Sequence, residues 1–121
     1  MKRSGIFAAL MALCTLGTSP AIAEEFTVVS DREQFLSLIT GRELTRMGIR
    51  LEVSPGGEIS GRAFGTPVTG AWDWNGNYFC RDLYYGEEDL GPNCQQVAVN
   101  GNTLRFTSDR GTGRYADLRL R

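Results

Sequence analysis

The chain has no histidine, and Lys2 is its only lysine. Without histidine, Ser-His-Asp and Cys-His nucleophilic systems, a histidine general base and most zinc, copper and haem sites are excluded. No glycine-rich loop stands between a strand pattern and a helix pattern, so the sequence contains neither a dinucleotide fingerprint nor a P-loop. We therefore expect no cofactor, no metal site and no catalytic residues of these classes.

Long apolar runs are also lacking. The longest occupies residues 6–16, and about 11 residues are too few to cross a bilayer, which needs about 20. The run follows two basic residues and precedes the triplet Ala21-Ile22-Ala23. This order is typical of a secretory signal peptide. We expect residues 1–23 to be removed, leaving one domain over residues 24–121 in the periplasm or outside the cell.

Cysteine is scarce, with three in the chain. Cys14 lies in the predicted signal peptide, so its removal leaves Cys80 and Cys94. In an oxidising compartment, two remaining cysteines most simply form a disulfide. Closing a loop of about 15 residues would stabilise the fold by about 3 kcal/mol. A redox-active pair is the alternative, but these two cysteines lack the adjacent spacing that tunes a reactive thiol.

Positive charge is limited as well. Eleven of the 13 basic residues follow the signal peptide, all of them arginine, against 14 acidic residues, which gives a net charge of about −3. No long basic patch remains, so nucleic acid is not an expected partner. No later segment is apolar enough to span a membrane, and we expect a monomer without membrane contact after signal removal.

One helix is predicted, over residues 31–40. Ser30 is a suitable N-cap because Glu33 follows it at the capping-box spacing. An apolar stripe at helical spacing includes Phe35 and Ile39, and Gly41 is the expected end of the helix. The stripe is interpreted as part of the core.

From residue 42 onward the pattern has period two, with frequent turn signals. Strands are predicted over 43–46, 49–54, 58–64, 68–74, 77–85, 94–99, 102–107 and 115–120. Residues 65–67 are expected to break the sheet, residues 86–93 to form an acidic loop and residues 108–113 a glycine-rich loop. Asn75-Gly76 and Asn100-Gly101 predict type I′ hairpin turns. The predicted fold class is mainly β, an antiparallel meander forming a small barrel or a strongly curved sheet.

Aromatic residues are the first candidates for a binding site. Trp72 and Trp74 point to the same side of their predicted strand. They either pack in the core or form a platform for a flat or sugar-like ligand at a barrel mouth. Tyr84 and Tyr85 put aromatic groups on both faces of the next strand, so some are expected to be exposed.

A second candidate is the polar loop before the last strand. Arg110 and Arg114 either pair with Asp109 to close the loop or receive an anionic partner. These two arginines therefore join Trp72, Trp74 and the two tyrosines as possible ligand-binding residues.

Acidic residues offer an enzymatic alternative. Residues 87–89 are three consecutive carboxylates, but they lack the alternating oxygen ligands of a calcium loop, which favours a solvated turn. An acid-only hydrolase or lyase could use Asp73, Asp82 or Glu87. Any chain with 14 acidic residues permits such a choice.

The chain resembles small secreted proteobacterial proteins of uncharacterised function over nearly all of residues 24–121. The resemblance rests on Gly61-Arg62-Ala63-Phe64-Gly65, Val68-Thr69-Gly70-Ala71-Trp72-Asp73-Trp74, Tyr78-Phe79-Cys80-Arg81, Asn93-Cys94-Gln95 and the loop at 108–113. It implies a shared fold and a shared Cys80–Cys94 bridge. The Gly-x-Trp at 70–72 is also similar to that of lipocalin-like barrels.

Some members of that group are labelled dihydrodipicolinate reductase. That enzyme class needs a nicotinamide cofactor, a Rossmann domain and a histidine and lysine region. This chain has no dinucleotide fingerprint, no histidine and no lysine beyond the signal peptide. We therefore predict a small binding or interaction module without catalytic machinery, acting on an unknown small ligand or envelope protein. An inhibitor or envelope accessory acting through its loops is a further alternative.

The exported protein is expected to begin at Glu24 and to contain the Cys80–Cys94 bridge. Mass spectrometry of the denatured, unreduced protein should give the mass of residues 24–121 less two hydrogens, and reduction should restore them. A mass that includes residues 1–23, or no change on reduction, would contradict these expectations.

Overall fold

A computed structural model describes residues 25–121, and the predicted signal peptide at 1–23 lies outside them. These residues form nine strands and two short helices. The strands are β1 (Thr27–Val29), β2 (Leu44–Arg46), β3 (Ile49–Val53), β4 (Glu58–Ala63), β5 (Thr66–Asn75), β6 (Tyr78–Tyr85), β7 (Glu88–Asn100), β8 (Thr103–Thr107) and β9 (Tyr115–Leu120). The helices are α2 (Arg32–Ile39) and α3 (Ser108–Gly111). No helix among them is long and apolar enough to cross a bilayer.

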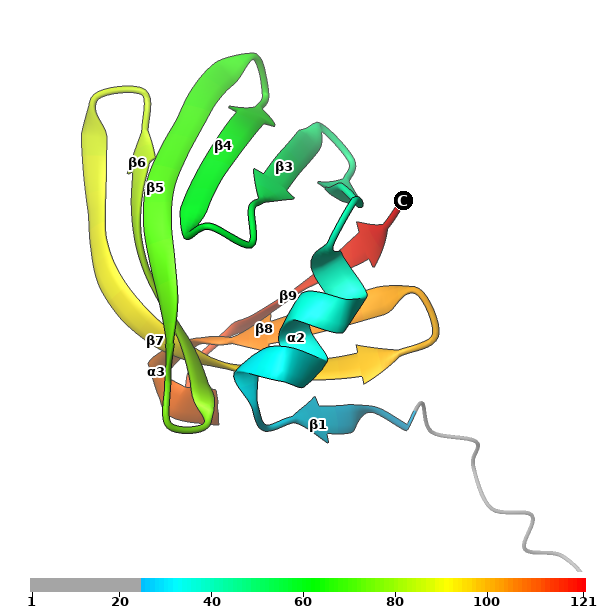
Figure 1. The fold of residues 1–121 in the computed structure, drawn as a ribbon. Coiled ribbons are helices and arrows are strands. Elements are labelled where there is room, and N and C mark those ends of the chain that lie inside the picture. Colours follow the sequence, from blue (N-terminus) through cyan, green and yellow to red (C-terminus); the bar gives the residue numbers. More distant parts are fainter. Residues whose placement is uncertain (1–24) are drawn as a thin grey trace, which may run out of the picture.

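Eight of the strands close into an antiparallel barrel (Figure 1). The meander from β2 to β8 runs through consecutive neighbours, while β9 pairs with both β8 and β2. The long strand β7 completes the ring by pairing with β6 through its first half and with β8 through its second. The ninth strand, β1, adds to β7 at Val97 to Val99. The mainly β prediction is confirmed, and the sheet is a closed barrel.

The alternation of side chains along β5 explains which face lies inside. Val68 and Trp72 are buried, whereas Thr69, Ala71 and Asp73 between and beside them are exposed. Successive strand residues point to opposite faces, so each second residue enters the barrel. Directly paired residues of neighbouring strands point to the same face, so the strand register identifies the inward residues of the other strands.

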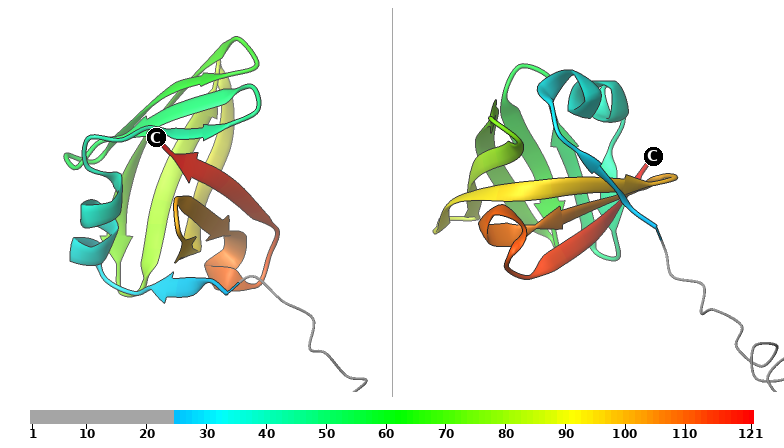
Figure 2. Two further views of the ribbon diagram at one scale, coloured as in Figure 1. Left: turned by 90° about the vertical axis from the view of Figure 1, so that its right-hand side faces the viewer. Right: turned by 90° about the horizontal axis from the view of Figure 1, so that it is seen from below.

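Helix α2 lies across the barrel, between β5 and the β7–β8 pair (Figures 1 and 2). Its N-cap is Asp31, whose carboxylate accepts a hydrogen bond from the Gln34 N–H at 2.8 Å. The Ser30 cap was therefore wrong by one residue. The segment contains two good caps in succession, each followed by Glu or Gln at the capping-box spacing.

Phe35 of α2 is the centre of the core. Its ring centroid lies 5.3 and 5.2 Å from those of Trp72 and Trp74, 5.1 Å from Phe79 and 6.4 Å from Phe106. These rings come from β5, β6 and β8, so one helical side chain joins three strands. Aromatic pairs at such separations add to the free energy of burial.

The turns differ from the predictions in several places. In each Asn-Gly hairpin the glycine, Gly76 or Gly101, has positive φ and the residue after it does not, so neither turn is type I′. Residues 86–93 are not a loop, because a two-residue turn leads directly into β7 at Glu88. Pro67 does not break the sheet, since it lies within β5 opposite Arg62. Residues 108–111 form the short element α3, but Asp109 and Arg110 have positive φ, so this part of the predicted glycine-rich loop is a tight turn and not a regular α-helix.

Truncation of Phe35 tests the role of α2. Phe35→Ala should reduce the free energy of unfolding by about 3–5 kcal/mol because it opens a cavity beneath two tryptophans. Ser37→Ala, on the exposed side of the same helix, should change it by less than about 0.5 kcal/mol. Urea unfolding measures both, and Phe35→Leu serves as a milder variant if Phe35→Ala does not fold. Equal stability of the Phe35 and Ser37 variants would contradict the assignment.

Candidate functional site

The barrel encloses a cavity of about 290 Å³, which we call the lumen cavity. Most of its wall is apolar and comes from six strands: Leu44, Leu51, Val53, Ile59, Phe79, Leu83, Phe106, Ala116 and Leu118. Five polar residues complete the lining, namely Arg81, Gln95, Ser108, Arg114 and Tyr115. An apolar cavity with a few convergent polar groups is the usual form of a small-molecule site.

Arg81 is the charged residue within this apolar wall. It faces inward because it lies opposite buried Trp72 and two residues after buried Phe79. One guanidinium N–H donates to the Gly91 carbonyl oxygen at 2.8 Å. Within residues 25–121 no carboxylate forms an ion pair with it. Arg81 therefore brings to the lumen cavity a positive charge that is near Asp82 but forms no ion pair with a carboxylate of residues 25–121.

The pKa of Arg81 reflects this position. Burial lowers the pKa of the guanidinium from its ordinary value, and the nearby Asp82 carboxylate opposes that effect. An arginine keeps its proton at neutral pH even so. The energetic cost of a partly desolvated charge is offset when an anion binds it.

Gln95 lies next to Arg81 in the polar part of the cavity and is only 8% exposed. Its side-chain amide donates to Asn93 Oδ1 and to Ser108 Oγ, both at 3.3 Å. Asn93 in turn donates to Asp109 Oδ1 at 2.8 Å and accepts from the Asp109 N–H at 3.1 Å. This chain of hydrogen bonds fixes α3 against β7 and directs Ser108 into the cavity.

The cavity meets solvent at the start of β9. Arg114 and Tyr115 are both exposed and both line the cavity. Arg105 lies 4.0 Å from the ring centroid of Tyr115 and 4.0 Å from that of Phe26. The same guanidinium makes two hydrogen bonds to Asp117, at 2.8 and 3.0 Å. Arg105 lies between buried Leu104 and Phe106 on β8, so the bidentate pair and the Tyr115 ring that packs on it are on the outer face of the barrel, beside the mouth.

The two arginines predicted from the loop are separated. Arg114 lines the lumen cavity, whereas Arg110 lies outside, 5.7 Å from the ring centroid of Tyr78. Arg110 and Asp109 both have positive φ, 56° and 55°. Asn93 stabilises this unusual backbone through its bonds to Asp109.

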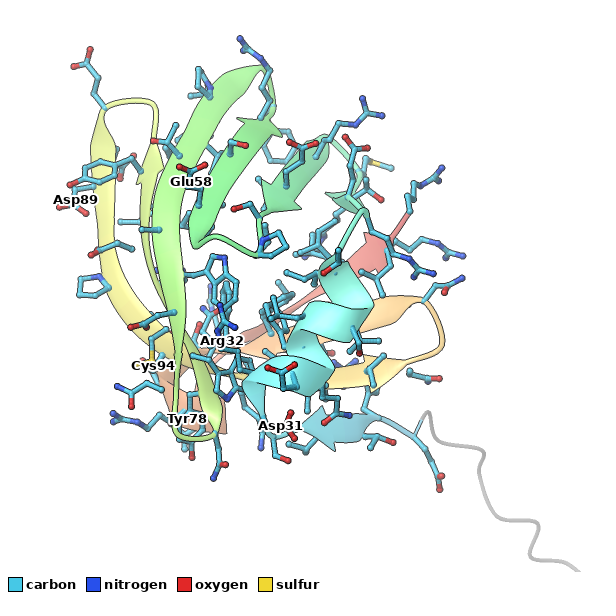
Figure 3. The ribbon with its side chains drawn as sticks, viewed as in Figure 1. Asp31, Arg32, Glu58, Tyr78, Asp89 and Cys94 are labelled. Carbon is cyan, nitrogen blue, oxygen red and sulfur yellow. A yellow bond between two sulfur atoms is a disulfide. The ribbon has the colours of Figure 1, made fainter. Side chains whose placement is uncertain are left out.

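The predicted aromatic residues are also divided between the core and the surface. Trp72 and Trp74 point the same way, and Phe35 covers both. Their indole N–H groups donate to the carbonyl oxygens of Ser54 and Gly76, each at 2.8 Å. Arg32 further covers Trp72, with its guanidinium carbon 5.7 Å from the ring centroid, and lies between α2 and β5 (Figure 3).

Neither tyrosine of the prediction lines the lumen cavity. Tyr84 is 42% exposed on the outer face of β6, and Tyr85 is half-buried at the end of that strand. The structure therefore brings only Arg114 of the six predicted ligand-binding residues to the cavity wall. Arg81, Gln95 and Tyr115 were missed. The alternation Phe79, Arg81, Leu83 was the available signal, since it places an arginine on an apolar face.

The predicted disulfide is confirmed. Cys80 and Cys94 are directly opposite each other on β6 and β7 and form a bridge. Cys80 lies between the cavity-lining residues Phe79 and Arg81, and Cys94 directly precedes cavity-lining Gln95. Adjacent strand residues point to opposite faces, so the bridge lies on the outer face of the barrel, away from α2 (Figure 3). It fastens the two strands that carry Arg81 and Gln95.

The acidic candidates lie outside the lumen cavity. Asp73 and Asp82 are exposed on the outer face, around a shallow hollow of about 310 Å³ next to the disulfide. Glu87 occupies the tight turn between β6 and β7. Within residues 25–121 no group of three or more Cys, Asp or Glu residues could hold a metal ion.

No protein-family model, curated protein or solved structure matches this chain. The functional interpretation therefore depends on the residues of the site.

Asp117 gives the stability of the fold a pH dependence. The hydrogen bonds from Arg105 lower the pKa of this carboxyl below its ordinary value, against the opposing effect of burial. A lowered pKa in the folded state stabilises the protein above the unfolded pKa of about 3.9, and this contribution is lost as the pH falls through the folded pKa. Because both side chains are partly exposed, it amounts to about 1 kcal/mol or less.

Asp117→Asn should therefore lower the free energy of unfolding at pH 7, and the difference from wild type should shrink as the pH falls below about 4. Urea unfolding across this pH range measures the difference. A difference that stays constant with pH would contradict the ion-pair origin. The Glu43–Arg50 pair, which is more exposed, provides the comparison through Glu43→Gln.

Proposed function

We propose that this protein is a small binding module of the periplasm or cell exterior whose barrel holds an amphipathic organic anion. The acid group of the ligand binds Arg81, and its apolar part lies against the wall of the lumen cavity. The observation that carries the proposal is an arginine that forms no ion pair with residues 25–121 and that lines a mainly apolar cavity.

The apolar wall supports a hydrocarbon part in the ligand. Leu44 and Leu118 face the cavity from β2 and β9, on the other side of the barrel from Arg81, and Phe106 faces it from β8. A volume of about 290 Å³ is near the lower end of small-molecule sites, which span about 300–1,000 Å³. Medium-chain carboxylates and alkyl sulfates combine the required acid group and length.

The polar groups support binding rather than turnover. Arg81 and Ser108 offer hydrogen-bond donors, whereas the Gln95 amide already donates to Asn93 and Ser108. The cavity lining among the described residues includes no carboxylate and no cysteine. Donors without a nearby general base suit recognition of an anion. Arg114 at the mouth adds a second positive charge near the entering ligand.

Arg81→Gln should weaken decanoate binding by about tenfold to a hundredfold, because a hydrogen bond to a charged group contributes about 1.5–3 kcal/mol. Titration calorimetry with decanoate and with decanol separates the two parts of the ligand. The wild-type protein should prefer decanoate, and the Arg81→Gln protein should bind the two alike.

Arg50→Gln is the matched control, since Arg50 is an exposed outer-face arginine. It should bind decanoate as the wild type does. Urea unfolding should give all three proteins similar stability, within about 1 kcal/mol. Failure of the wild type to bind decanoate, octanoate or decyl sulfate would refute the proposed function, and so would equal binding by Arg81→Gln.

A further inference from the structure

Two neighbouring hairpin turns carry exposed apolar side chains. Met47, in the β2–β3 turn, is 91% exposed, and Phe64, in the β4–β5 turn, is 70% exposed. The Phe64 N–H donates to the Gly48 carbonyl oxygen at 2.7 Å, and the Phe64 ring lies directly over Gly48. The two turns are therefore fixed side by side, at the end of the barrel opposite β1 and α3 (Figures 1 and 2).

Phe64 adopts a left-handed backbone conformation, which is energetically unfavourable for a bulky side chain. The pairing of Ala63 with Thr66 leaves Phe64 and Gly65 as a two-residue turn, and their φ angles are 51° and 83°. Asn, Asp or Gly is preferred at the first position of such a turn. A bulky residue with positive φ is a strained outlier, and strain of this kind accompanies functional positions.

The outer face beside these turns is strongly basic. Arg119, Thr45, Arg50 and Arg62 are successive cross-strand neighbours on β9, β2, β3 and β4. Arginines directly opposite each other, such as Arg50 and Arg62, repel. Two carboxylates lie beside this row: Glu43 pairs with Arg50 at 3.4 Å, and Asp117, which pairs with Arg105, also interacts with Arg46.

We call the following residues the tip surface: Arg46, Met47, Arg50, Phe64, Arg62, Arg119 and Arg121. All except Phe64 line one hollow of about 700 Å³, and none of the acidic residues between positions 25 and 121 contributes to its lining. Five of the eleven arginines beyond the signal peptide thus gather at one end of a domain whose net charge is negative. This concentration needs an explanation other than overall composition.

We propose that the tip surface docks on an anionic lipid bilayer. Met47 and Phe64 enter the interfacial region, and the surrounding arginines contact acidic headgroups. Exposed apolar side chains beside a row of arginines match the chemistry of an anionic membrane surface. This proposal is independent of the lumen cavity. The sequence predicted no membrane contact. The tip residues are scattered between positions 46 and 121, so no continuous basic or apolar segment indicates this surface.

Co-sedimentation with vesicles tests the proposal. The full-length mature protein should bind vesicles of equal parts phosphatidylglycerol and phosphatidylcholine and should not bind phosphatidylcholine alone. Binding should weaken strongly at 1 M salt, where the screening length is about 3 Å. Equal binding to both vesicle types, or to neither, would overturn the proposal.

Variants separate docking from folding. Phe64→Asn should reduce binding while keeping or raising stability, because asparagine tolerates positive φ. Met47→Ser should also reduce binding, and Arg62→Gln or Arg119→Gln should each weaken it by about fivefold. Tyr84→Ser, which removes an exposed aromatic elsewhere, is the control and should have no effect. If Phe64→Asn and Met47→Ser bind as the wild type does, the surface attracts charge alone and the bilayer assignment is wrong.

Discussion

The packing of Phe35 between Trp72, Trp74, Phe79 and Phe106 is the interaction on which the rest of the structure depends. Phe35 of α2 contacts both tryptophans of β5 and completes the aromatic cluster that they form with Phe79 and Phe106. With α2 in place, the aromatic residues fill one part of the interior and the lumen cavity remains in the other. The helix thus decides which part of the barrel is core and which part can receive a ligand.

Strand alternation then gives the same three strands two roles. On β2, β3 and β9, Leu44, Leu51 and Leu118 face the lumen cavity. Their neighbours in sequence, Thr45, Arg50 and Arg119, face outward in the basic row. One set of strands therefore builds an apolar wall inside and a cationic surface outside. The Cys80–Cys94 bridge secures the opposite side, where β6 and β7 present Arg81 and Gln95.

The sequence predicted the fold more closely than the site. Period-two patterns and turn residues located nearly every strand, because local alternation and glycine reflect burial and backbone geometry directly. They failed at residues 86–93. The start of β7 is exposed on both faces, so its acidic residues show no alternation of apolar and polar side chains and suggested a loop. Pro67 is tolerated in β5 for a reason that no local pattern reveals, since it depends on which strand lies beside it.

The site was missed because it is assembled from distant residues. Trp72 and Trp74 attracted attention through their chemistry, yet only the position of α2 decides that they are covered. Arg81 was visible as an arginine between two apolar residues of alternating spacing. Its lack of an acidic partner depends on strands brought together by closure of the barrel, which the sequence left open as either barrel or curved sheet.

The most direct test is a crystal structure of the protein with a bromine-tipped decanoate, located by the anomalous signal of bromine. The account predicts the carboxylate within hydrogen-bond distance of Arg81 and the bromine among Leu44, Phe106 and Leu118. A bromine found only on the outer surface, or a carboxylate that avoids Arg81, would contradict it.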